Sequence, residues 1–98
     1  MTRMNTWDET KRRRNLKDHR IDFADLEDFF SGDLLTREDR REAYREPRYQ
    51  SIGVLHGVAL FVAWTPRGED GDIPHLISAR KAENHETKSW SSYYGTRR

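Results

Sequence analysis

The feature that most constrains the fold is a continuous apolar run, Val58–Thr65, in a chain that is otherwise rich in charge. Its β-branched and aromatic residues are typical of a strand rather than a helix. Because nearly every position is apolar, we predict a central strand that is buried on both faces. A tight turn at Leu55–Val58 precedes the run, so Tyr49–Leu55 is predicted to pair with it as a hairpin.

Shorter patterns on either side predict further elements. His75–Arg80 follows a polar connection and is expected to form the next antiparallel strand. Leu34–Thr36 is predicted as a short strand ahead of a charged surface loop, and residues 82–90 as a short C-terminal helix. Residues 1–6 are expected to supply an edge strand that ends at the first tryptophan.

Two helices are predicted near the N-terminus. Asp8 is a suitable N-cap for the first, which runs to His19 with many basic residues and must therefore lie on the surface. Asp22 caps the second, in which apolar residues recur at roughly helical spacing and acidic residues occupy the other side. Gly32 suits the left-handed position that ends this helix. The apolar side chains predicted to be core are Phe23, Leu26, Phe29 and Phe30.

Composition narrows the classes of protein to consider. Ninety-eight residues make one domain with a modest core, and 11% aromatic residues with a net charge of +1 argue against disorder. The absence of cysteine excludes disulfides, thiolate metal sites and a cysteine nucleophile. The charged N-terminal residues contain no apolar signal-peptide core, and no run is long enough to span a membrane. We therefore expect a cytoplasmic protein with no membrane partner.

Charge is distributed unevenly along the chain. Residues 1–20 carry seven basic and three acidic groups. Residues 21–46 carry four basic and nine acidic groups, and residues 47–98 carry seven basic and five acidic groups. A polyanion is therefore expected to bind at a local site, built from the N-terminal segment and the C-terminal half. The elements together predict a single α+β domain over residues 1–90, with two N-terminal helices packed on a small antiparallel sheet and a short C-terminal helix. Residues 91–98 are interpreted as a tail.

Several short motifs in this chain resemble the BrnT family of type II toxins, in the same order and with the same spacing, across residues 6–90. The residues that carry the resemblance are Trp7-Asp8 with Lys11, Asn15–His19, Ile21–Phe23, Arg48–Gly53, and Ile77–Ala82 with Glu86.

The resemblance implies a RelE-like ribonuclease fold and a toxin that inhibits growth. It also implies a BrnA-like antitoxin of the ribbon-helix-helix type, which would neutralise the toxin in a hetero-oligomer. Operator DNA would then be bound only through the antitoxin, since no recognition helix is evident in this chain. With no cysteine and no closely spaced carboxylate–histidine ligand set, we expect RNA cleavage without a metal or other cofactor.

This chain departs from the family pattern at Arg20, where the family usually has glycine. Arginine tolerates a positive φ less well than glycine, so we expect the turn after the first helix to differ. The charged stretch 37–46 and the loop 68–72 do not map onto family features.

Three segments supply basic side chains that are candidates for binding the phosphate of a substrate. Arg80 is the strongest candidate, because its guanidinium offers a two-pronged donor to phosphate oxygens; the alternative is a solvated charge at a strand end. Lys81 alternates to the other face of that strand and is assigned to substrate binding, as is Arg14 on the basic first helix. Arg48 is either a second cation of the site or a salt-bridge partner.

Proton transfer has several candidates. His19 titrates in the right range, but it equally fits a cap at a helix end. Lys17 binds phosphate, acts as a general acid or is merely solvated, and Glu86 is either a base or an exposed helical carboxylate. The late tyrosines Tyr93 and Tyr94 are further candidates in a segment expected to be mobile. The remaining histidines, interpreted as turn or surface residues, are His56, His75 and His85.

A second hypothesis is a non-catalytic binding module, or a degenerate toxin that acts within a DNA-binding repressor complex. It is supported by the lack of an unambiguous acid–base pair in the sequence and by the nearly neutral net charge.

Overall fold

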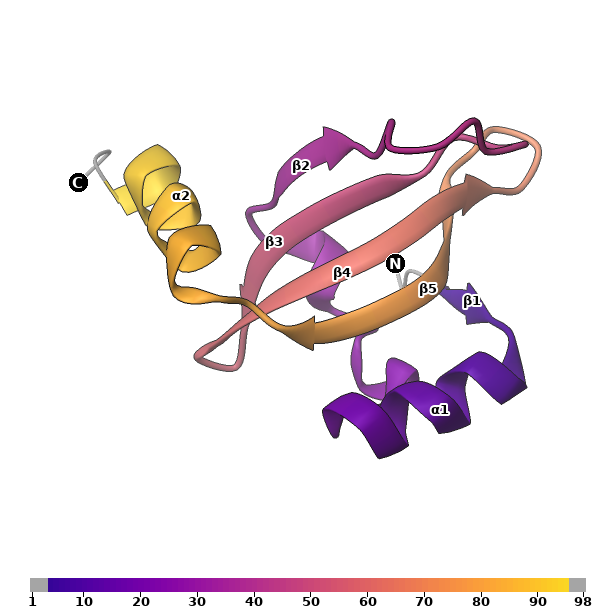
Figure 1. Ribbon diagram of the computed structural model, residues 1–98, viewed down its shortest axis with the longest axis horizontal. Helices are drawn as coiled ribbons and strands as arrows, with labels where there is room; N and C mark the ends of the chain where they lie inside the picture. The colour runs from indigo at the N-terminus through magenta and orange to yellow at the C-terminus, as the bar shows by residue number, and fades with distance from the viewer. Residues whose placement is uncertain (1–3, 96–98) are drawn as a thin grey trace.

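A five-stranded sheet in the order β1-β5-β4-β3-β2 forms the centre of the computed structural model, which describes residues 4–95. Helix α1 lies beside β5, and α2 lies at the end of the sheet remote from β1 (Figure 1). In chain order the elements are β1 (Thr6–Trp7), α1 (Glu9–His19), the 3₁₀-helices η1 (Phe23–Asp25) and η2 (Phe29–Ser31), β2 (Leu35–Glu38), β3 (Tyr49–Leu55), β4 (Val58–Arg67), β5 (Ile73–Lys81) and α2 (Asn84–Tyr94).

The predicted hairpin and the strand after it are confirmed, since β3, β4 and β5 pair antiparallel in that order. The hairpin turn is made by His56 and Gly57, whose φ angles are 50° and 81°. Positive φ at both central residues is the turn geometry that matches the twist of the flanking strands. The sheet is mixed rather than purely antiparallel, because β1 pairs parallel with β5.

Strand β4 is central in the sheet, but the prediction that both of its faces are buried is wrong. Leu60 and Val62 on the core face are buried, whereas Phe61 and Ala63 on the opposite face are only half-buried. Thr65, farther along that opposite face, is buried and donates to the Pro47 carbonyl. The run is apolar on both sides because the second face is partly covered, at one end, by α2. One face therefore carries the core and the other remains partly open.

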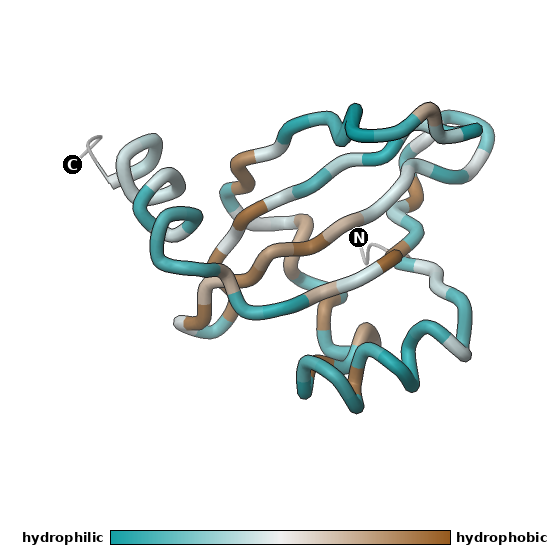
Figure 2. The backbone as a smooth tube through the Cα atoms, in the orientation of Figure 1, coloured by the Kyte–Doolittle hydropathy of each residue, from teal (hydrophilic) through white to brown (hydrophobic). Residues whose placement is uncertain are grey.

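The core consists of apolar side chains from one face of β4 and β5 and from the segment that follows α1. Brown stretches mark β4 and the segment after α1 in Figure 2. Gly53 of β3 lies against this core, where an added Cβ would stand 2.6 Å from Leu34 Cδ2 and 3.0 Å from Phe29 Cε1. Position 53 therefore requires glycine, because a side chain there would clash with Leu34 and Phe29. The core residues are Phe23, Leu26, Phe29, Phe30, Leu60, Val62, Leu76 and Ala79.

The prediction of a second α-helix is wrong, because this segment forms the two 3₁₀-helices η1 and η2. Leu26 N–H donates to the Phe23 carbonyl, and Phe29 N–H donates to the Leu26 carbonyl, both at 3.1 Å. Three residues per turn is the 3₁₀ period, and it places the side chains at 23, 26 and 29 on one side. The spacing of three was visible in the sequence, and the tighter helix uses it to bury all three.

Asn15 attaches α1 to the edge of the sheet. Its side chain is among the few buried polar groups, with the amide nitrogen donating to the Ile21 carbonyl and the amide oxygen accepting from Ala79 N–H, each at 2.9 Å. The pairing of β1 with β5 ends at Trp7 and Leu76, so this N–H has no strand partner. Asn15 supplies the acceptor that a longer β1 would have supplied.

We expected the turn after α1 to differ because Arg20 stands where glycine is usual, but the ordinary left-handed helix end forms there. Arg20 adopts the left-handed conformation, with φ 61° and ψ 26°, and its N–H donates to the Leu16 carbonyl at 3.0 Å. This is the ordinary way in which a helix ends, and the position that Arg20 occupies is one where glycine is usually favoured. The bond from Asn15 to Ile21, immediately after the turn, holds the chain in this conformation.

Helix α2 runs to Tyr94, past the predicted end at residue 90, so residues 91–94 are helical rather than a tail. Its second half is fixed by side-chain donors, since Trp90 Nε1 donates to the Asp33 carbonyl and the Tyr94 hydroxyl donates to the Leu34 carbonyl. The domain boundary after residue 90 stays a prediction. Within residues 4–95, neither α-helix combines the length and the apolar character needed to cross a membrane.

Replacing Asn15 by alanine is expected to lower the free energy of unfolding by about 2–3 kcal/mol, because it leaves the buried Ala79 N–H and the Ile21 carbonyl without partners. Urea denaturation followed by circular dichroism measures the change. The matched control on the same helix is Arg13→Ala, which is expected to stay within about 0.5 kcal/mol of the wild type. Equal effects of the two substitutions would contradict this role for Asn15.

Candidate active site

The face of the sheet opposite the core carries a row of cross-strand neighbours. Arg80 of β5 lies opposite Phe61 of β4. Phe61 lies opposite Ile52 of β3, which in turn lies opposite Leu35 of β2. The first turns of α2 border this row and close a cavity of about 320 Å³, which we call the open-face cavity. Its polar lining residues are Thr36, Arg37, Gln50, His85, Glu86 and Ser89.

Arg80 does not itself line this cavity but forms a two-pronged ion pair with Glu86, which does. Arg80 donates from Nη1 to Glu86 Oε1 at 2.8 Å and from Nη2 to Oε2 at 2.9 Å. The guanidinium carbon lies 4.1 Å from the centre of the Phe61 ring. The Glu86 side chain is 9% exposed and that of Arg80 is 33% exposed, so the pair is partly shielded from water. Stacking and pairing together fix the orientation of the guanidinium.

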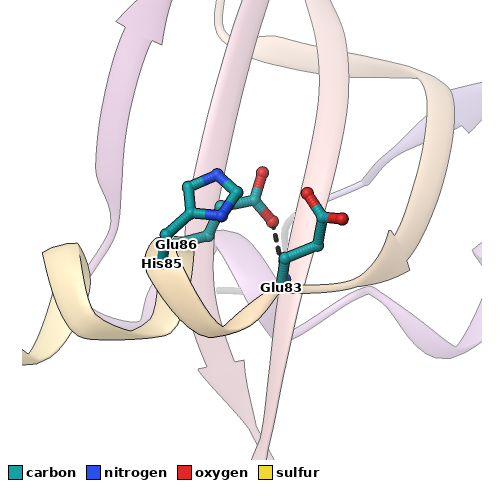
Figure 3. Close-up of side chains that lie close together, drawn as sticks. All are labelled: Glu83, His85 and Glu86. Atoms are coloured by element: carbon teal, nitrogen blue, oxygen red, sulfur yellow. Dashed lines mark hydrogen bonds between the residues drawn. The ribbon is translucent and has the colours of Figure 1, made fainter.

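The start of α2 positions Glu86. Glu83 is the N-cap, and its backbone N–H donates to Glu86 Oε1 at 2.7 Å, which forms a reciprocal capping box with the Glu83 side chain (Figure 3). Hydrogen bonding to Arg80 is the main cause that holds the pKa of Glu86 below its usual value. The same bond raises the pKa of Arg80. Both groups are therefore charged at neutral pH.

Within the described part of the chain, one cluster has metal-ligating side chains close together: ligand atoms of Glu83, His85 and Glu86 lie within 4.8 Å of one another (Figure 3). Both carboxylate oxygens of Glu86 already accept hydrogen bonds from Arg80. A divalent ion at Glu86 would compete with this guanidinium. The cation that the carboxylate holds in the structure is Arg80.

The candidates on α1 lie away from the open-face cavity. Arg14 and His19 line a separate groove of about 230 Å³ between α1 and Ile77 of β5, and Lys17 is exposed on the same helix. None of the three lines the open-face cavity. The structure therefore brings Glu86, and not His19 or Lys17, to Arg80.

The other two predicted cations lie apart as well. Lys81 is exposed and pairs with Leu60, so it alternates to the face opposite Arg80, as expected for a strand. Arg48 precedes β3 and stacks on Tyr44, with its guanidinium carbon 4.2 Å from the ring centre. It lines a cavity formed by the loop after β2 rather than the open-face cavity. Its Nε is buried and has no hydrogen-bond partner among the described residues.

Three residues of the open-face cavity were missed by sequence reasoning. His85, interpreted above as a surface residue, lies beside Glu86 in the first turn of α2. Arg37 of β2 lies opposite Gln50 of β3, and Arg37 Nε donates to Gln50 Oε1 at 2.8 Å. The available signal was strand alternation, since Gln50 and Ile52 are two residues apart on the same face. Tyr93 and Tyr94 do not line this cavity.

Comparison with known proteins assigns the chain to a family. The family model described as "Ribonuclease toxin, BrnT, of type II toxin-antitoxin system" matches residues 7–86. The chain belongs to the BrnT toxin family. The match includes both Arg80 and Glu86. A search of curated proteins finds no match.

A solved structure supports the same assignment. The crystal structure of the Brucella abortus ribonuclease toxin BrnT is 30% identical in sequence and superposes with a TM-score of 0.60. The alignment covers 85% of this chain and all of that one. The α+β architecture is thus that of BrnT, and the resemblance based on the motifs is confirmed.

Replacing Glu86 by glutamine is expected to lower the free energy of unfolding by about 1–2 kcal/mol at pH 7, because the charged hydrogen bonds to Arg80 are lost. The folded-state pKa of Glu86 lies below its usual value of 4.5, so the ion pair stabilises the fold above that pH and its contribution is lost as pH falls further. The difference in the free energy of unfolding between the wild type and Glu86→Gln should therefore disappear in acid. Urea denaturation at several pH values measures this difference. Glu27→Gln, at an exposed position, is the control; a gap that does not depend on pH would contradict the assignment.

Proposed function

We propose that the protein is a metal-independent, RelE-like endoribonuclease that cleaves RNA at the open-face cavity and thereby inhibits translation and growth. The observation that carries the proposal is the two-pronged pair of Arg80 and Glu86 at the border of that cavity. A carboxylate occupies the two donors that a phosphate would use, since both anions present paired oxygens to a guanidinium. Family membership supports the same substrate class.

In the proposed reaction the 2′-oxygen of a ribose bonds to the adjacent phosphorus, and the bond from phosphorus to the 5′-oxygen breaks. The products are a 2′,3′-cyclic phosphate and a 5′-hydroxyl. A base takes the 2′-hydroxyl proton and an acid protonates the leaving oxygen. Arg80 donates hydrogen bonds to the phosphate oxygens, on which negative charge grows in the transition state.

Glu86 is proposed as the base. Its pKa is lowered chiefly by the hydrogen bond from Arg80. When a phosphate takes over the guanidinium, that cause is removed and the pKa of Glu86 rises, so the carboxylate becomes a stronger base once substrate is bound. His85 has a ring nitrogen within 4.8 Å of a Glu86 oxygen and is proposed as the acid.

The remaining candidates are assigned to RNA binding outside the reacting centre. Arg14, Lys17 and His19 lie on α1, on the far side of β5 from the open-face cavity, and would contact the phosphate backbone through charge. Arg48 and Lys81 would extend this contact at other edges of the sheet.

Metal independence is proposed because Arg80 supplies the positive charge that a metal ion supplies elsewhere. We expect RNA cleavage by the purified protein to persist in EDTA. Arg80→Ala should lower kcat at least 100-fold, and Arg80→Lys should recover part of this loss, because it restores charge without the two-pronged geometry. Gel analysis of a defined RNA measures the rates.

Lys88→Ala, on the exposed side of α2, is the matched control and should cleave at the wild-type rate. Circular dichroism tests whether each variant remains folded. Wild-type cleavage by a folded Arg80→Ala protein would exclude the proposed site, and cleavage abolished by EDTA would exclude metal independence.

We further propose that a BrnA-like, ribbon-helix-helix antitoxin neutralises the toxin in the cytoplasm by covering the open-face cavity, and that operator DNA is bound through the antitoxin. Arg37, Arg80 and the apolar Phe61 offer such a partner a mixed surface. Co-expression of the antitoxin should restore growth, and an equimolar mixture should reduce RNA cleavage to background. Undiminished cleavage in a stable complex would show that the antitoxin binds elsewhere.

The alternative is a non-catalytic module, or a degenerate toxin, within a DNA-binding repressor complex. It is favoured by the same ion pair, because Glu86 already occupies the donors of Arg80 in the free protein. Absence of RNA cleavage by the wild-type protein, together with operator binding by the antitoxin complex, would favour this alternative.

A further inference from the structure

The open-face cavity is larger than a phosphate site requires and has two kinds of wall. Its floor is apolar, with Leu35, Ile52 and Phe61 side by side across three strands. At about 320 Å³ it is in the range of cavities that hold a planar organic group. Arg80 borders the cavity over the Phe61 ring, so a nucleotide whose phosphate binds Arg80 has an apolar surface beside it for its base.

Arg37 presents oriented donors at the opposite wall. Its Nε donates to Gln50 Oε1 at 2.8 Å, and Gln50 is itself 93% buried, with an exposed fraction of 7%. Among the described residues, no carboxylate pairs with Arg37, whereas its neighbours Arg40 and Arg41 each pair with an acidic side chain. The terminal nitrogens of Arg37 also donate to no described residue. Arg37 is therefore a fixed guanidinium whose outer edge is available to a ligand.

The spacing suits one nucleotide. Arg80 lies on β5 and Arg37 on β2, three strand spacings away and two residues along from Leu35, which is in register with Arg80. The two backbones are therefore about 16 Å apart. The two long side chains shorten the gap between their guanidinium groups. A ligand that reaches both has an anionic group at one end and an acceptor-rich edge at the other.

We propose that the open-face cavity binds a guanine base next to the scissile phosphate, with Arg37 donating to the O6 and N7 acceptors of the base. A guanidinium has donors only, and guanine is the base that presents two adjacent acceptors to it. Adenine places an amino donor where guanine has O6, so it faces Arg37 donor to donor. Gln50 acts as the positioning residue that holds Arg37 in place. This inference rests on the proposed ribonuclease function and adds its sequence preference.

Cleavage of short RNAs that contain a single purine tests the preference. Guanosine and inosine, which share O6 and N7, should be cut at similar rates. Adenosine should be cut about 10- to 100-fold more slowly, and 7-deazaguanosine should fall between them. Arg37→Ala should reduce cutting at guanosine to the adenosine rate, so that the preference between the two bases is lost. Arg40→Ala, on the neighbouring exposed loop, should keep the wild-type preference.

Binding of 3′-GMP and 3′-AMP, followed by NMR shifts, separates this inference from the proposed function. Tighter binding of 3′-GMP that is lost in Arg37→Ala supports the base site even if no RNA is cut, in which case the ribonuclease proposal alone fails. RNA cleavage with equal rates at guanosine and adenosine overturns the guanine site and leaves the ribonuclease proposal intact. Equal affinity for the two nucleotides overturns it as well.

Discussion

The structure depends on burial of one face of a twisted sheet by a small number of apolar side chains. The segment after α1 supplies half of the core from two short 3₁₀-helices, and β4 and β5 supply the rest. A core of this size cannot cover both faces, since a short chain buries a smaller fraction of its surface than a long one. The second face is therefore left for binding, and β4 is the strand that both faces share. Fold and site are consequences of the same one-sided packing.

The Arg80–Glu86 pair joins the end of the last strand to the start of the last helix and lies at the border of the open-face cavity. Each side chain of the pair also hydrogen-bonds to the main chain. Arg80 donates to the Lys81 carbonyl, and Glu86 accepts from Glu83 N–H. A group held this firmly is preorganised, which is what stabilisation of a charged transition state requires. The open-face cavity thus combines a fixed cation, an adjacent carboxylate and an apolar floor.

Sequence patterns predicted the hairpin, the later strand and the first helix, because each has a strong local signal such as the Asp8 cap or the apolar run. They failed at the second helix, where a spacing of three and a spacing of 3.6 are hard to distinguish over ten residues. Arg80 and Glu86 were both selected as candidates, but their contact was not, since it depends on how α2 turns after β5. Arg37 belongs to no motif and Gln50 was noted only as part of Arg48–Gly53, and only the register of β2 on β3 brings the two together.

Helix α2 is held at its far end by Trp90 and Tyr94, whose acceptors are the main-chain carbonyls of Asp33 and Leu34. A carbonyl is present whatever side chain its residue carries. Position 33 is therefore free to vary between related chains without loosening the helix, while the two aromatic donors are not. In a comparison of many homologues, the two aromatic residues on α2 would be retained, but substitutions at position 33 would not be paired with changes in them. Covariation would therefore fail to reveal one of the main attachments of this helix.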